Sequence, residues 1–153
     1  MNWKKLAASL ALPLAVGAVA ALLSSPMAGF AAMNPPPLTP PPWVFPVVWT
    51  TLYLLMGYCA YRIQTASADP AQIRQALNSY LLQLGINFLW PLVFFRLQWY
   101  LGALVLLAAL WYCVFLTLRR FSAIDETAGN LLLPYILWVT FALYLNFGVY
   151  LLN

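Results

Sequence analysis

The chain has 153 residues, of which 65% are hydrophobic, 16% aromatic and only 7% charged. A soluble domain carries about 25% charged residues, so this composition excludes a water-soluble monomer. The sequence has no histidine and three carboxylates, Asp69, Asp125 and Glu126, too few for most metal sites and conventional acid–base sites. We therefore expect neither a metal site nor conventional catalytic residues.

Five apolar segments follow one another along the chain, and every charged residue lies between them or at their ends. About 20 apolar residues cross a bilayer as a helix. The pattern therefore predicts one all-α integral membrane domain over residues 1–153. Its five predicted spans cover residues 6–23, 43–61, 77–95, 99–118 and 128–152.

The first apolar segment directly follows Lys4 and Lys5, which leaves two interpretations open. A basic start, an apolar stretch and small residues near positions 28–32 are typical of a cleavable signal peptide. The apolar part of a signal peptide is normally about 7–15 residues long. Here it has 18 residues, which favours a retained first span.

Residues 24–42 are predicted to form a loop, because prolines crowd positions 35–37 and 40–42 and fit no helix interior. The second span has Pro46 in its first turn, where a missing N–H is tolerated. Asp69 fits the start of the third helix. Asp125 and Glu126 place negative charge at the start of the fifth helix.

The basic residues fall almost entirely on one side of the predicted topology. Five spans place the loops alternately on two sides, and only Arg96 lies on the second side. The first side holds Lys4, Lys5, Arg62, Arg74, Arg119 and Arg120. The positive-inside rule then predicts a multi-pass protein with its N-terminus inside and its C-terminus outside. The expected location is a bacterial inner membrane.

Three predicted spans each carry a stripe of polar and aromatic side chains along one helical face. The stripes are Phe45, Trp49 and Tyr53; Gln83, Asn87, Trp90 and Phe94; and Tyr135, Trp138, Ala142 and Asn146. Amides that face lipid are costly, so the stripes must face other helices or a cavity. The amides either join helices or line a cavity. Tryptophans deep inside three spans favour a pocket for a large, flat, apolar ligand.

Three blocks of sequence resemble the signature of the TspO/MBR family, the tryptophan-rich sensory proteins related to the mitochondrial translocator protein. Residues 40–53 read PPPWVFPVVWTTLY and resemble PP-x-W-V-F-x-x-V-W-T-x-L-Y. Residues 83–95 resemble Q-L-x-x-N-x-x-W followed by F-F, and residues 134–146 resemble P-Y-x-x-W-x-x-F-A-x-x-L-N. The blocks stand in the family's order and spacing.

The resemblance implies a five-transmembrane-helix bundle with an internal ligand cavity beneath the first long loop. Family members bind porphyrins and other tetrapyrroles, so a porphyrin or haem-type tetrapyrrole is the implied ligand, with no obligatory cofactor. By motif position, the ligand-binding residues would be Trp49, Asn87, Trp90, Trp138 and Ala142, with further contributions from Phe45, Tyr53, Phe94, Tyr135 and Asn146.

The chain departs from the family's usual pattern before its double proline. Gly29 and Phe30 stand where a Trp-Tyr pair is usual, and Pro35 and Pro36 stand where Lys-Pro is usual. The animal proteins' cholesterol motif needs a basic residue after its tyrosine, and none follows Tyr150. Specific cholesterol recognition is therefore not expected.

The leading hypothesis for function is a membrane sensor or receptor that stacks a porphyrin-like ring between Trp49 and Trp138. One alternative is light-driven oxidative breakdown of the bound porphyrin, which has been proposed for the family. Another is tetrapyrrole or sterol transport, which neither an internal repeat nor an intramembrane charge supports.

Two further expectations concern small side chains and partners. Cys59 and Cys113 lie in apolar segments, which favours buried thiols over a disulfide. Family members often form homodimers, and Gly17 with Ala21 makes a small-xxx-small pair on the first span. The expected partners are thus the lipid bilayer, a tetrapyrrole and a second copy, whereas the sparse basic residues predict no nucleic acid.

Overall fold

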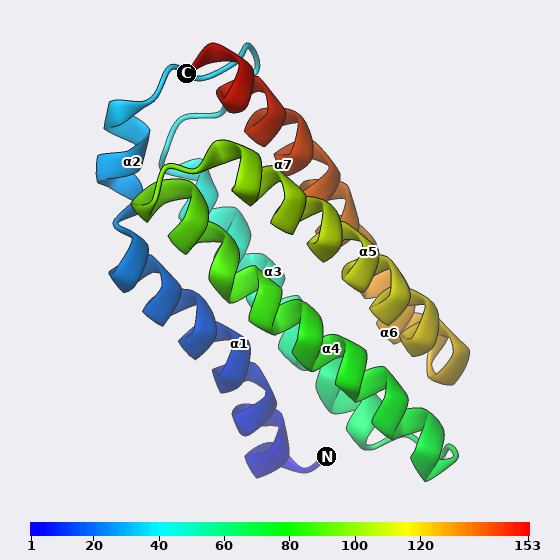
Figure 1. The fold of residues 1–153 in the computed structure, drawn as a ribbon. Coiled ribbons are helices and arrows are strands. Elements are labelled where there is room, and N and C mark those ends of the chain that lie inside the picture. Colours follow the sequence, from blue (N-terminus) through cyan, green and yellow to red (C-terminus); the bar gives the residue numbers. More distant parts are fainter.

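The computed structural model describes residues 1–153 and consists of helices without strands. Five helices are long and apolar enough to cross a membrane, which confirms the predicted all-α five-helix membrane bundle. The elements are α1 (Trp3–Ser24), α2 (Pro26–Ala32), α3 (Val44–Gln64), α4 (Pro70–Pro91), the π-helical turn η1 (Leu92–Arg96), α5 (Tyr100–Ile124), α6 (Glu126–Leu131) and α7 (Leu133–Leu152). The N-terminus lies at one end of the bundle and α2 with the C-terminus at the other (Figure 1).

The most extensive helix contacts join α4 to α5, α1 to α3 and α5 to α7. The contact between α1 and α3 depends on Gly57, because a β-carbon there would lie 2.5 Å from the carbonyl oxygen of Ser9. Cys59 and Cys113 are buried free thiols, as predicted. Gly17 packs against the ring of Tyr53 in the same chain, so this glycine serves the α1–α3 contact. The homodimer stays a prediction.

The predicted loop over residues 24–42 is wrong in its first part, because Pro26–Ala32 form the short helix α2. Pro26 occupies the first turn, where its missing N–H is tolerated because N–H groups of the first turn have no partner within the helix. Gly29 lets α2 approach η1 closely, since a β-carbon there would lie 2.6 Å from the Phe95 ring. Residues 33–43, called the proline segment below, contain no helix, as their prolines predict.

Pro91 marks the transition from α4 to the π-helical turn η1. Proline has no N–H, so the carbonyl of Asn87 lacks its usual helical donor. The widened turn is closed by a hydrogen bond of 3.0 Å from the Leu97 N–H to the Leu92 carbonyl. The predicted third span therefore ends in a different kind of helix from the one in which it begins.

The fourth long helix continues to Ile124, beyond the arginine pair at which the sequence predicts the end of the span. Arg120 Nη1 donates to the Gln75 carbonyl at 3.0 Å and to Ser79 Oγ at 2.8 Å. Phe121, one residue further, is completely buried. These contacts with α4 hold the extra turn in helical form.

Two other helix boundaries differ from the predicted spans. The third long helix begins at Pro70 rather than at 77, because the Asp69 carboxylate accepts the Ala71 N–H at 3.2 Å and caps it. The fifth is divided at Leu132 into α6 and α7. Pro134 explains the break, since its nitrogen cannot donate to the preceding turn.

Candidate functional site

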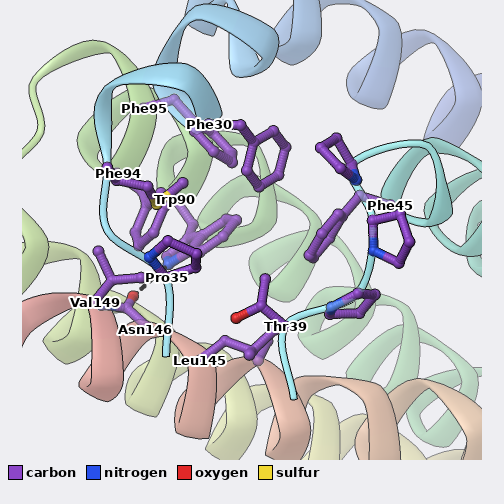
Figure 2. A pocket seen from close by; sticks show the side chains of 15 residues that line it. Phe30, Pro35, Thr39, Phe45, Trp90, Phe94, Phe95, Leu145, Asn146 and Val149 are labelled. Atoms are coloured by element: carbon purple, nitrogen blue, oxygen red, sulfur yellow. Dashed lines mark hydrogen bonds between the residues drawn. The ribbon is translucent and has the colours of Figure 1, made fainter. Parts of the chain in front are cut away.

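The bundle contains a pocket of about 330 Å³ beneath the proline segment, at the end that carries the C-terminus. Figure 2 shows the lining side chains arranged around a common space. They are Phe30, Met33, Pro35, Thr39, Pro40, Pro41, Pro42, Phe45, Trp90, Phe94, Phe95, Ala142, Leu145, Asn146 and Val149. None of these side chains is ionisable, so the pocket is uncharged and largely apolar.

Aromatic rings form much of the pocket wall. Phe30 of α2 lies between Phe45 and Phe95, with ring centres 4.9 and 5.0 Å away. Trp90 stacks on Phe94 at 4.9 Å, with the two planes 26° apart. Because the turn η1 is widened, two consecutive phenylalanines both reach the pocket. Such a wall is suited to a flat apolar ring, which gains by stacking and edge-to-face contact.

Asn146 is the single amide that lines the pocket, and both ends of its amide already have partners. Trp90 Nε1 donates to Asn146 Oδ1 at 3.0 Å, and Asn146 Nδ2 donates to the Tyr100 carbonyl at 3.0 Å. The Thr39 hydroxyl donates to the Pro36 carbonyl at 2.7 Å. No group of three or more His, Cys, Asp or Glu residues could hold a metal ion. The pocket therefore offers shape and aromatic surface rather than free polar groups.

Half of the ten predicted ligand-binding residues line this pocket: Phe45, Trp90, Phe94, Ala142 and Asn146. The other half lie outside its lining: Trp49, Tyr53, Asn87, Tyr135 and Trp138. Contact of any of the ten with a ligand stays a prediction. The structure shows which neighbours each of these side chains has.

A hydrogen-bonded network of four side chains links α3, α4 and α7 inside the bundle. The Tyr53 hydroxyl donates to Asn87 Oδ1 at 2.8 Å, and Asn87 Nδ2 donates to the Tyr135 oxygen at 2.8 Å. The Tyr135 hydroxyl in turn donates to Gln83 Oε1 at 2.6 Å. Gln83, Asn87 and Tyr135 are all buried. Both amides thus join helices, the first of the two interpretations that the sequence left open.

Trp49 and Trp138 have different surroundings. Trp49 packs on Tyr53 and Tyr135, with ring centres 5.7 and 6.3 Å away, and so covers the hydrogen-bonded network. Trp138 meets Phe45 edge to face at 5.8 Å and also lines a second hollow, on the outer side of α3 and α7. Trp138 therefore stands beside the pocket wall rather than inside it.

Ten lining residues are absent from the predicted set: Phe30, Met33, Pro35, Thr39, Pro40, Pro41, Pro42, Phe95, Leu145 and Val149. Two of them have a periodic signal in the sequence. Leu145 and Val149 continue the helical stripe of Trp138 and Ala142 by two further turns. The residues of α2 and the proline segment follow no such period, and only the folded chain brings them over the pocket.

Charged residues lie at the ends of the bundle, away from the pocket. Arg62 at the end of α3 binds the Asp125 carboxylate with both Nε and Nη2, at 2.8 and 3.3 Å. Asp125 also caps α6, since its carboxylate accepts the Thr127 and Ala128 N–H groups. The Arg62 guanidinium lowers the pKa of Asp125, and the capping bonds lower it further. At the opposite end, Arg96 Nη1 donates to the Leu23 carbonyl at 2.8 Å and caps α1.

Five long apolar helices with charges confined to their ends define an integral, multi-pass membrane protein. The chain belongs to the TspO/MBR family, whose sequence profile matches residues 9–152.

The chain is similar to named relatives from bacteria and mammals. It is 37% identical to protein CrtK of Rhodobacter capsulatus over 137 residues, which are 90% of this chain and 85% of that protein. It is 40% identical to the tryptophan-rich sensory protein of Cereibacter sphaeroides over 121 residues, 79% of this chain and 74% of that one. It is 32% identical to the translocator protein of Bos taurus over 125 residues, 79% and 72% of the two chains. The family and these names support a role as a membrane sensor or transporter.

Proposed function

We propose that this protein is a membrane sensor that binds a flat, apolar ligand of the porphyrin type in the pocket beneath the proline segment. The observation that carries the proposal is the uncharged pocket, walled by aromatic rings from α2, α3, α4 and η1. Stacking on such rings favours a conjugated macrocycle over a small polar metabolite.

The size of the pocket suggests how binding is sensed. Ligand pockets have volumes of about 300–1,000 Å³, so a pocket of about 330 Å³ is small for a substituted macrocycle. A bound porphyrin would have to displace the proline segment, whose prolines form part of the lining. The displaced segment would present an altered surface at that end of the bundle. Ligand binding would then shift the population between a closed and an open form.

The lining residues also specify which form of the ligand fits best. No lining residue carries a positive charge, so the propionates of a porphyrin would remain at the mouth of the pocket. The pocket also lacks histidine and cysteine ligands for iron, which favours a metal-free ring. We therefore expect the dimethyl ester of protoporphyrin IX to bind within about threefold as tightly as the free acid. A much weaker ester would show that a basic residue recognises the propionates.

The test is a dark titration of the purified protein with protoporphyrin IX, using Trp90→Phe and a matched control. Trp90 lines the pocket and donates to Asn146, whereas Trp111 donates to Thr140 Oγ1 at 2.9 Å and does not line the pocket. Both substitutions remove one interhelical hydrogen bond, so their effects on packing are comparable. We expect Trp90→Phe to raise the Kd about tenfold and Trp111→Phe to leave it unchanged. No binding at micromolar porphyrin by the unmodified protein would refute the proposal.

Illumination of the same samples separates sensing from chemistry. If the protein is a sensor only, illumination should bleach the bound porphyrin no more than it bleaches free porphyrin in detergent. The alternative of light-driven breakdown requires an indole next to the ring as electron donor. If it is correct, product forms with the unmodified protein and is lost in Trp49→Phe or Trp138→Phe while binding persists.

A further inference from the structure

A second hollow lies on the outer side of the bundle, in the groove between α3 and α7. Its volume is about 470 Å³. The groove is lined by Val47, Val48, Thr51, Leu52, Leu55, Pro134, Leu137, Trp138 and Phe141. Several of these side chains are exposed, Val47 at 57% and Leu137 at 68%, so in a membrane the groove faces lipid. It exists because α7 packs mainly on α5, while α3 and α7 make little backbone contact.

One pair of aromatic rings lies between this groove and the pocket. Phe45 lines the pocket, Trp138 lines the groove, and their ring centres lie 5.8 Å apart. Ala142, one turn beyond Trp138 on α7, again lines the pocket. A side-chain movement of Trp138 would therefore connect the two spaces without displacing any helix.

The indole of Trp138 lacks the kind of hydrogen bond that holds the indoles of Trp90 and Trp111. Its Nε1 is buried and has no hydrogen-bond partner. Trp90 and Trp111, which also lie between helices, donate to Asn146 and Thr140. Because this buried donor has no partner, rotation of Trp138 breaks no hydrogen bond.

The route through the proline segment, in contrast, is closed by specific contacts. The Asn34 N–H donates to Asn153 Oδ1 at 2.9 Å, and Asn153 Nδ2 donates back to the Asn34 carbonyl at 3.0 Å. The Tyr144 hydroxyl donates to the Pro37 carbonyl at 2.7 Å. A ligand that arrived from water would have to break these bonds before it reached the pocket. An apolar ligand is in any case concentrated in the bilayer, not in water.

We infer that the groove between α3 and α7 is the entrance through which the apolar ligand passes from the bilayer into the pocket, with Trp138 as its movable wall. The inference rests on the proposed function, since it concerns the ligand of that pocket. An entrance lowers the barrier in both directions and leaves the bound state unchanged. Its obstruction must therefore slow association and dissociation by the same factor and leave the Kd as it was.

The test uses two identical substitutions at lipid-facing valines. Val47→Trp fills the groove, and Val105→Trp places the same ring on α5, where Val105 is 65% exposed and lines neither space. Protein reconstituted in lipid nanodiscs is mixed rapidly with vesicles that carry protoporphyrin IX or pyrene, a flat hydrocarbon without charges. We expect Val47→Trp to slow both rate constants about tenfold with an unchanged Kd, and Val105→Trp to change neither.

A disulfide that fixes the proline segment tests the alternative route, in which the ligand enters through that segment. Asn34→Cys with Asn153→Cys, oxidised, ties the segment to the end of α7, and we expect pyrene to enter this variant at the unmodified rate. If the disulfide stops pyrene entry, or if Val47→Trp leaves the rates unchanged, the lateral entrance is refuted while the proposed function stands. If pyrene binds and protoporphyrin IX does not, the porphyrin assignment fails, and the entrance stands only if Val47→Trp slows both pyrene rate constants. If neither binds, both proposals fail.

Discussion

At the residue scale, Tyr135 is the side chain on which the polar centre of the bundle depends. Its hydroxyl accepts from Asn87 and donates to Gln83, so one oxygen serves two buried amides on α4. Tyr135→Phe would leave both amides short of a partner, and we expect it to lower the free energy of unfolding by about 1–2 kcal/mol. Reversible unfolding in mixed detergent micelles measures this loss.

The matched control for this substitution is Tyr112→Phe on α5. Tyr112 is 61% exposed and its hydroxyl has no hydrogen bond within the chain. We expect that variant to unfold like the unmodified protein. Equal stabilities of Tyr135→Phe and Tyr112→Phe would mean that the network contributes nothing to the fold.

Gly57 is a second residue whose identity follows from a close contact. A β-carbon there would lie 2.5 Å from the Ser9 carbonyl oxygen and 2.8 Å from the Leu10 Cα. These are backbone atoms, which cannot rotate away as the end of a side chain can. We expect Gly57→Ala to destabilise the protein by about 1–3 kcal/mol. Gly85→Ala is the control, since a β-carbon at Gly85 meets no atom within 4 Å. Thermal unfolding should show a lower Tm for Gly57→Ala and an equal or higher Tm for Gly85→Ala.

At the scale of the element, Pro91 accounts for the π-helical geometry of the turn η1. Pro91→Ala restores an N–H that can donate to the Asn87 carbonyl, which favours a regular α-helix in place of the widened turn. Phe94 and Phe95 would then no longer both reach the pocket, so we expect porphyrin affinity to fall about tenfold. Pro13→Ala, inside α1 and away from the pocket, is the control and should leave the Kd unchanged.

The ion pair between Arg62 of α3 and Asp125, which caps α6, makes the stability of the protein depend on pH. The Arg62 guanidinium lowers the pKa of Asp125 below its ordinary value of 3.8. A depressed folded-state pKa adds stability above the ordinary pKa, and this stability is lost as the pH falls through the folded-state value. Asp125→Asn keeps a capping side chain but removes the ion pair. We expect it to reduce stability at pH 7, by no more than about 1 kcal/mol for a pair this exposed, and less at pH 3.

The control for the ion pair is the neighbouring carboxylate. Glu126 is exposed, and the one ion pair of the chain joins Arg62 to Asp125. Glu126→Gln should therefore match the unmodified protein at both pH values. A stability deficit of Asp125→Asn that is the same at pH 7 and pH 3 would contradict the assignment of the pH dependence to the ion pair.

At the scale of the whole molecule, hydropathy and charge suffice to predict the bundle, because a span must be apolar throughout and charges are confined to its ends. The helical period also assigns Gln83 and Asn87 to the interior. It cannot name their partners, since a period specifies a face and not the helix opposite. The sequence pattern misses α2 because the crowded prolines after it dominate the local signal. The pocket is predicted only where regular helices line it, and its cover depends on tertiary contacts.

The direction of the bundle in the membrane is the last property that the charges predict. The helix ends that carry the six basic residues of the predicted inner side meet at the N-terminal end of the bundle (Figure 1). Arg96 at the other end caps α1 through the Leu23 carbonyl, so its position has a structural reason. We therefore expect a cytoplasmic N-terminus, with the pocket and C-terminus facing outward. Alkaline phosphatase, which folds only outside the cytoplasm, should be active when fused after Asn153 and inactive when fused after Gln72. The reverse pattern would invert the topology and place the pocket on the cytoplasmic side.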